Sequence, residues 1–174
     1  MSGASRRSAP GKPLVTSADA PYSSGGNRSS TLVDAAKAFG YEAAVAGQNS
    51  PHSADRWKTI AGLWESAIAR LNNIPIDDPG YGEAQTLLAQ YQSNLGTVRE
   101  NAAKEEASAR ALTSANNKST RMLAQNLERL ERNQIASLLQ DIINDLEAVQ
   151  PNTTSYARAT EMLKSANQKL AQLQ

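Results

Sequence analysis

Few side chains in this sequence could carry catalytic or metal chemistry. His52 is the single histidine, and the 174 residues contain no cysteine. A histidine metal site or a Ser-His-Asp triad needs further groups gathered by the fold, so we interpret His52 as a residue of the loop that starts a helix. The absence of cysteine excludes thiol catalysis, disulfides and Cys-ligated zinc or iron–sulfur sites.

The acidic residues do not form a clear catalytic pattern either. Asp77 and Asp78 precede Pro79-Gly80, and adjacent carboxylates in a turn point apart, whereas glycosidase chemistry needs two carboxyls across a cleft. The pair Glu105-Glu106 and the charged run at residues 128–132 could form a metal site or a recognition patch, but such charges usually mark the solvated side of a helix. We predict no catalytic, metal-binding or cofactor-binding residue and no enzyme.

Aromatic residues offer a different kind of site. Trp57, Trp64 and Tyr91 fall at helical spacings, with Asn94 one turn after Tyr91. Such residues could form a ligand-binding or partner-binding cluster, although aromatic side chains at these spacings more often fill a core. We take these four as the candidate partner-binding residues of the body, with Trp57 as the expected exposed anchor because it is nearest a helix start.

A second candidate site is the N-terminal segment of residues 1–30. It carries a charge of +3, against −2 for the remaining 144 residues, and is rich in Ser, Gly, Pro and Arg. We predict a disordered tail whose favoured role is to aid solubility, and the sharper alternative is that Arg6, Arg7, Lys12 and Tyr22 fold onto an acidic protein partner. An organelle transit peptide is disfavoured because Pro and Gly leave little amphipathic helix.

The overall charge limits the partner classes. A net charge of +1 argues against nucleic acid, because proteins that bind the phosphate backbone usually carry a basic surplus on one face. No stretch has the roughly 18 apolar residues of a membrane span, and no secretory signal is visible. We expect a cytoplasmic protein.

Apolar residues at helical spacing predict an all-α fold of about five helices. The expected helices are residues 31–47, 54–73, 81–112, 119–149 and 155–173. Pro51, Pro75 and Pro151 lie between them, and Thr113–Asn117 should interrupt the pattern. After Val98 the apolar stripe thins to alanines, which predicts a solvated, fraying helix end. The domains are thus a tail at 1–30 and a helical body at 31–174.

The sequence also indicates an internal repeat. An offset of 75, which aligns Tyr81 with Tyr156, pairs apolar residues without a gap across two helical hairpins at about 54–112 and 119–174. Shared helical periodicity alone could produce such pairs, but the equal loop length and the tyrosine after each loop favour duplication. Two stacked antiparallel hairpins would each bury the other's apolar face.

Residues 43–98 contain a series of short motifs. They are Trp57 and Trp64, Ala67-Ile68, Ile74-Pro75, Pro79-Gly80-Tyr81, and Tyr91 followed by Asn94-Leu95. This series resembles helical modules of cyanobacterial proteins. The resemblance implies a tetratricopeptide-like helical-hairpin module with no activity attached. The second hairpin departs from the pattern because it lacks both tryptophans and the Asn-Leu pair.

These observations favour a non-catalytic scaffold or adaptor whose helical body binds another protein, with the tail as a second contact. The alternative is a homo-oligomer in which Leu123, Leu127, Leu130 and Leu138 of the fourth helix form a coiled coil. A helical ligand carrier or enzyme is the remote alternative, because no acid, base, nucleophile or metal constellation is visible.

Overall fold

The computed structural model describes residues 24–125 and 127–173 of the chain. Five α-helices and one short 3₁₀ helix make up the described part, which contains no strand. They are α1 (Ser24–Ala46), α2 (Ala54–Leu71), α3 (Tyr81–Ala124), the 3₁₀ helix η1 (Leu127–Arg129), α4 (Arg132–Glu147) and α5 (Tyr156–Leu173). The predicted all-α fold of about five helices is confirmed.

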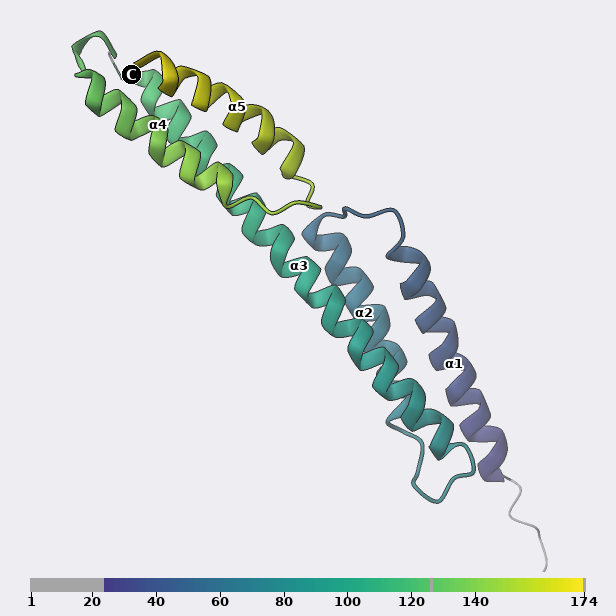
Figure 1. The fold of residues 1–174 in the computed structure, drawn as a ribbon. Helices are drawn as coiled ribbons and strands as arrows, with labels where there is room; N and C mark the ends of the chain where they lie inside the picture. Colours follow the sequence, from purple (N-terminus) through teal and green to yellow (C-terminus); the bar gives the residue numbers. More distant parts are fainter. Residues whose placement is uncertain (1–23, 126, 174) are drawn as a thin grey trace, which may run out of the picture.

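One helix organises the molecule. With 44 residues, α3 extends over about 66 Å and serves as a spine for the other helices. Helices α1 and α2 lie along its first half, and α4 and α5 lie along its second half (Figure 1). The arrangement is two three-helix bundles that share α3, which we call the N-terminal bundle and the C-terminal bundle.

The N-terminal bundle has the larger core. Ser53 caps α2 by accepting a hydrogen bond from the Arg56 N–H at 3.3 Å, as expected for a serine before a helix. The buried side chains come from all three helices and from the loop after α2. They are Val33, Ala36, Ala43, Trp57, Ile60, Trp64, Ala67, Leu71, Ile74, Ala84, Tyr91, Leu95 and Val98.

Smaller residues build the core of the C-terminal bundle. Its buried members are Ala115, Met122, Leu139, Ile142, Leu146, Val149 and Ala159, and none is aromatic. Between α3 and α4, the Lys118 ammonium lies 2.7 Å from the Asp145 carboxylate and donates to the Asp141 carbonyl at 3.1 Å. These contacts fasten the second half of α3 to α4.

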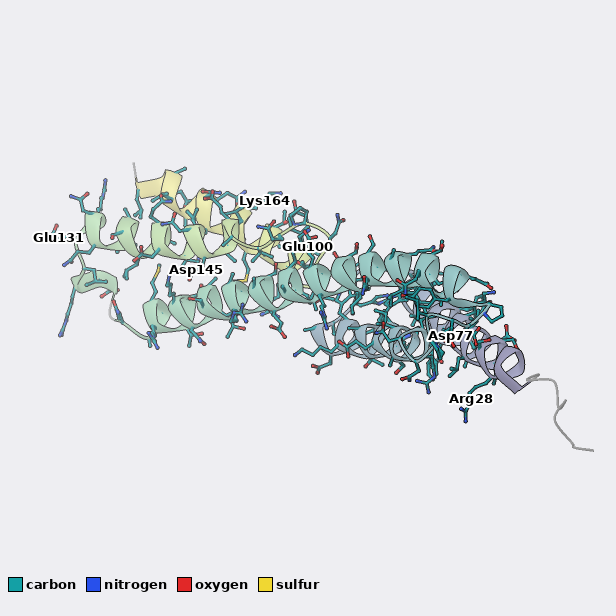
Figure 2. The ribbon with its side chains drawn as sticks, turned by 90° about the horizontal axis from the view of Figure 1, so that it is seen from below. Arg28, Asp77, Glu100, Glu131, Asp145 and Lys164 are labelled. Atoms are coloured by element: carbon teal, nitrogen blue, oxygen red, sulfur yellow. The ribbon has the colours of Figure 1, made fainter. Side chains whose placement is uncertain are left out.

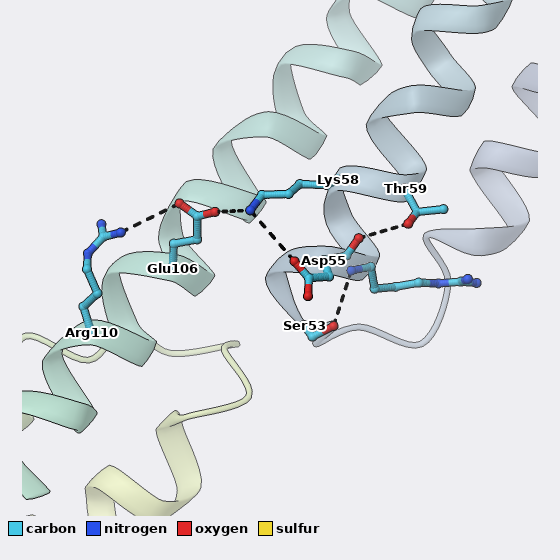
Figure 3. A network of polar contacts seen from close by, with 7 residues as sticks. Ser53, Asp55, Lys58, Thr59, Glu106 and Arg110 are labelled. Carbon is cyan, nitrogen blue, oxygen red and sulfur yellow. Dashed lines mark hydrogen bonds and ion pairs between the residues drawn. The ribbon is translucent and has the colours of Figure 1, made fainter.

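The two bundles meet at the middle of α3, where Glu105 and Glu106 contact different elements. Glu106 accepts from Lys58 of α2 at 2.7 Å and lies 3.8 Å from Arg110 of α3 (Figure 3). Glu105 is buried and accepts hydrogen bonds from the backbone N–H and hydroxyl of Thr154, in the loop before α5. The prediction that Glu105 belongs to a solvated face is therefore wrong.

The predicted interruption at Thr113–Asn117 is also wrong, because α3 runs through it without a break. The Thr113 hydroxyl donates to the Ala109 carbonyl at 2.8 Å, and Ala115 is fully buried against the C-terminal core. Thr, Ser and Asn each disfavour a helix by no more than about 0.7 kcal/mol relative to Ala, which packing readily offsets. The part of α3 after Val98, predicted to be solvated and to fray, is likewise packed, since Glu105, Ser108 and Ala115 are buried there.

The chain turns instead at residues 125–131, inside the predicted fourth helix. The Glu131 N–H donates to the Gln134 side chain at 2.9 Å, so α4 begins with a capping interaction at Arg132. Leu123 therefore lies on α3 and Leu138 on α4, while Leu127 is in η1. The single leucine seam predicted for a coiled coil does not exist.

Helix α1 begins at Ser24, seven residues before the predicted start of the helical body at residue 31. Ser29 is buried and lies beside Gly80, a tertiary contact that the Ser- and Gly-rich composition could not indicate. The remainder of the predicted tail lies outside the described residues.

The helix starts agree with the offset of 75, since α3 begins at Tyr81 and α5 at Tyr156. The same offset places α4 on α2 and the second half of α3 on α1. The duplication itself stays a prediction. Within the described residues, no helix combines the length and apolar character needed to cross a membrane.

Candidate protein-interaction groove

The aromatic residues singled out in the sequence lie in the core of the N-terminal bundle. Trp64 of α2 and Tyr91 of α3 are 5% and 7% exposed, with ring centroids 5.0 Å apart. The Tyr91 ring also lies against α1, where a Cβ on Gly40 would be only 2.8 Å from its Cζ and Oη atoms. Burial raises the pKa of the Tyr91 hydroxyl, and the charge of Lys37 opposes part of that rise. These rings hold the three helices together.

Trp57 is 7% exposed, so the expectation of an exposed tryptophan anchor is wrong. Its ring meets the His52 ring edge-on, with centroids 5.0 Å apart, which places both residues in the packing at the start of α2. Asn94 lies half-buried on α3. The other candidates, Arg6, Arg7, Lys12 and Tyr22, lie outside the described residues.

A groove opens in the C-terminal bundle between α3 and α5, above α4. Its volume is about 340 Å³. Apolar side chains from all three helices line it, with serines and two charged residues beside them: Ser119, Met122, Leu123, Leu139, Ile142, Glu161, Met162, Ser165, Ala166 and Lys169. Leu123 is 68% exposed, so part of this apolar lining faces solvent.

At the offset of 75, two residues of the groove align with aromatic residues of the N-terminal bundle. Leu139 and Ala166 stand 75 residues after Trp64 and Tyr91 (64 + 75 = 139; 91 + 75 = 166), and all four are buried. Tyr91 is the eleventh residue of α3 and Ala166 the eleventh residue of α5. Because leucine and alanine are smaller than tryptophan and tyrosine, a bundle packed in the way that the predicted repeat implies would have space left between its outer helices.

The charges around the groove are mixed and solvated. Glu161 and Lys169 of α5 line it and are exposed, and Arg158 lies on the same side of α5, one turn before Met162. None of these three makes an ion pair within the described residues. They are free to pair with groups on a bound partner.

Asp145 stabilises the helix pair beneath the groove. Burial alone would raise its pKa, but hydrogen bonds from Lys118 and Ser114 and the Lys118 charge together lower it. The ion pair is therefore maintained near neutral pH. It keeps α4 fastened to α3, and α5 packs on α4.

The groove is suited to non-covalent binding. No group of three or more His, Cys, Asp or Glu that could hold a metal ion occurs in the described parts of the chain. The lining offers apolar contact surface, two methionines that adapt to ligand shape, and a polar edge. Sequence reasoning missed it, although the alignment at offset 75 already pairs Trp64 with Leu139 and Tyr91 with Ala166.

Comparison with protein-family models, with curated proteins and with solved structures finds no match to this chain. The resemblance to cyanobacterial helical modules stays a prediction.

Proposed function

We propose that this protein is a non-catalytic scaffold that binds another protein through the groove of its C-terminal bundle. The observation that carries the proposal is an apolar, partly solvent-exposed groove, whose Leu139 and Ala166 align at the predicted offset of 75 with the buried Trp64 and Tyr91. Exposed apolar surface edged by polar groups is typical of protein-interaction sites. Because the groove is formed by packed helices that include α3, little conformational entropy of the protein is lost on binding.

The predicted tail contacts remain part of the proposal. Arg6, Arg7, Lys12 and Tyr22 would supply a second, basic contact to an acidic region of the same partner, and two linked contacts bind more tightly than either alone. A cytoplasmic location also belongs to the proposal, supported by the absence of cysteine.

A photocrosslinking residue placed at Leu123 in the groove tests the proposal in living cells. The matched control is the same residue at Ile76, which is 80% exposed in the loop before α3, at the other end of the molecule. We expect a crosslinked protein from position 123 only, and its loss when Ala166→Tyr fills the groove. Equal crosslinking at both positions, or none at position 123, contradicts the proposal.

A small-molecule carrier is the second candidate, because a volume of about 340 Å³ falls at the small end of known ligand sites. The exposed Leu123 leaves the groove partly open to solvent, whereas drug-sized ligands are usually mostly enclosed. Mass spectrometry of the purified protein under native conditions separates the two. A bound apolar molecule that Ala166→Tyr expels would favour the carrier.

A further inference from the structure

We infer that the occupant of the groove is helix α1 of a second copy of this chain, an inference that rests on the proposed function of the groove. Helix α1 carries an apolar stripe on the side facing away from its own bundle. The stripe consists of Ala38, Tyr41 and Val45, spaced by three and four residues, and we call it the outer stripe of α1. Tyr41 is 74% exposed and Val45 is 45% exposed.

The outer stripe is distinct from the face of α1 that packs into the N-terminal bundle. That inner face carries Ala36 and Ala43, which are 0% and 1% exposed. A helix with apolar residues on two opposite sides is expected to have two packing partners. Its own bundle supplies only one of them.

The groove matches this stripe in size and chemistry. Its counterpart in the N-terminal bundle contains a tyrosine ring from one helix against a tryptophan from another, so the space left by Ala166 is suited to an aromatic side chain. The sulfur atoms of Met122 and Met162 make favourable contacts with aromatic rings. Tyr41 would supply the ring, with Val45 one turn further along.

The charges beside the two surfaces are complementary. Asp34 lies one turn before the outer stripe and Glu42 flanks it, and neither makes an ion pair within the described residues, whereas Lys37 pairs with Glu83 at 2.6 Å. Beside the groove, Arg158 and Lys169 give α5 a basic surplus over Glu161. Docking would place two acids of α1 against two bases of α5, which favours the correct pairing over alternatives.

One chain cannot make this contact with itself. Tyr41 follows Gly40, which lies against Tyr91, and the groove residue Met122 comes 31 residues later on the same straight helix (122 − 91 = 31). At 1.5 Å per residue the two surfaces are about 46 Å apart. The bundles lie toward opposite ends of α3, so two antiparallel copies would bring each stripe to the other copy's groove (Figure 1).

Size-exclusion chromatography with light scattering on the full chain tests the inference. We expect a concentration-dependent mass approaching twice 18.6 kDa. Tyr41→Lys and Ala166→Tyr should each weaken dimerisation at least about tenfold, as expected at the centre of an interface. Tyr156→Ala is the matched control, since Tyr156 is 44% exposed and lies outside both surfaces, and it should leave the dimer unchanged.

Mixing the two variants separates direct contact from misfolding. The Tyr41→Lys copy retains an intact groove and the Ala166→Tyr copy retains an intact outer stripe, so the mixture should recover one of the two contacts and associate more strongly than either variant alone. Far-UV circular dichroism checks that both remain helical.

A monomer at every concentration, or a dimer that Tyr41→Lys leaves intact, overturns the inference. The proposed function fails separately. If the protein is monomeric but the crosslink from position 123 to another protein persists and depends on Ala166, the groove binds a different partner and only the second-copy inference is lost. If no crosslink forms at that position either, both are lost.

Discussion

Gly40 shows how one missing side chain determines the packing of a bundle. The Tyr91 ring lies over Gly40 on one side and meets Trp64 on the other, so it bridges α1, α3 and α2. Any side chain at residue 40 would compete with the ring for the same space. The glycine therefore allows the close approach that makes an aromatic core possible here.

Gly40→Ala should destabilise the protein by about 1 kcal/mol, because overpacking costs roughly 1–3 kcal/mol while alanine improves helix propensity by up to about 1 kcal/mol. Gly62→Ala is the control: no atom lies within 4 Å of the added Cβ there, so it should stabilise by about 0.5–1 kcal/mol. Urea unfolding measures both. Equal effects at the two glycines would contradict the account of Tyr91.

The contribution of Asp145 to the stability of the folded protein should depend on pH. Its pKa is lowered in the folded protein relative to its ordinary value of 3.8, so its contribution to stability is present above pH 3.8 and is lost as the pH falls through the folded pKa. Asp145→Asn should reduce stability at pH 7 and flatten the loss of stability below about pH 4. Asp141→Asn, on the exposed side of α4, should change neither. Thermal unfolding between pH 7 and pH 3 measures the difference.

Among the elements, the loop before α5 depends on α3 for its polar contacts. The Glu105 carboxylate accepts from Thr154, and one turn later the Ser108 hydroxyl accepts from the Gln150 N–H at 3.0 Å. Glu105 and Ser108 are 3% and 0% exposed, so water cannot easily replace these partners. The middle of α3 therefore determines where α5 begins.

Glu105→Ala should cost about 1.5–3 kcal/mol, the usual range for a hydrogen bond to a charged group, because it leaves the Thr154 N–H without its acceptor. Glu105→Gln retains an acceptor and should cost less. Glu100→Ala is the control on the same helix, since Glu100 is exposed and its ion pair with Lys104 at i+4 is solvated, so this change should cost far less than Glu105→Ala. An equal loss for Glu100→Ala and Glu105→Ala in urea unfolding would argue against a role for the loop contact.

At the scale of the whole molecule, the shared helix couples the two bundles. Figure 2 shows Arg28 and Asp77 near one end of the molecule and Glu131 at the other, with α3 running between them. Neighbouring units that share a continuous helix stabilise each other through their common interface. Near this junction, the Lys58–Glu106 ion pair joins the start of α2 to the middle of α3.

This coupling can be observed because both tryptophans lie in the N-terminal bundle, so their fluorescence reports that bundle alone. Leu146→Ala in the C-terminal core should cost about 2–5 kcal/mol and shift the fluorescence midpoint together with the circular-dichroism midpoint. If the fluorescence midpoint stays in place while the helical signal is lost in two steps, the bundles unfold independently.

The amino-acid sequence by itself determined the helices whose apolar period is strong and whose ends are marked. The loops containing Pro51, Pro75 and Pro151 placed the starts of α2, α3 and α5 to within one residue, because a proline restricts the backbone over only a few residues. Trp64 and Tyr91 fall at helical spacings in the sequence, at which aromatic side chains more often fill a core, and both rings are buried.

Only the tertiary structure decided where α3 ends and where a surface remains open. The residue types of Thr113–Asn117 predict a helix break, whereas in the structure the helix continues and Ala115 is buried. The real turn comes at residues 125–131, whose sequence contains no proline or glycine to mark it. The groove likewise depends on the distance between α3 and α5. The small side chain of Ala166 leaves a space there because both helices pack on α4. Such spacing is set by contacts between helices far apart in the chain, which local residue patterns do not encode.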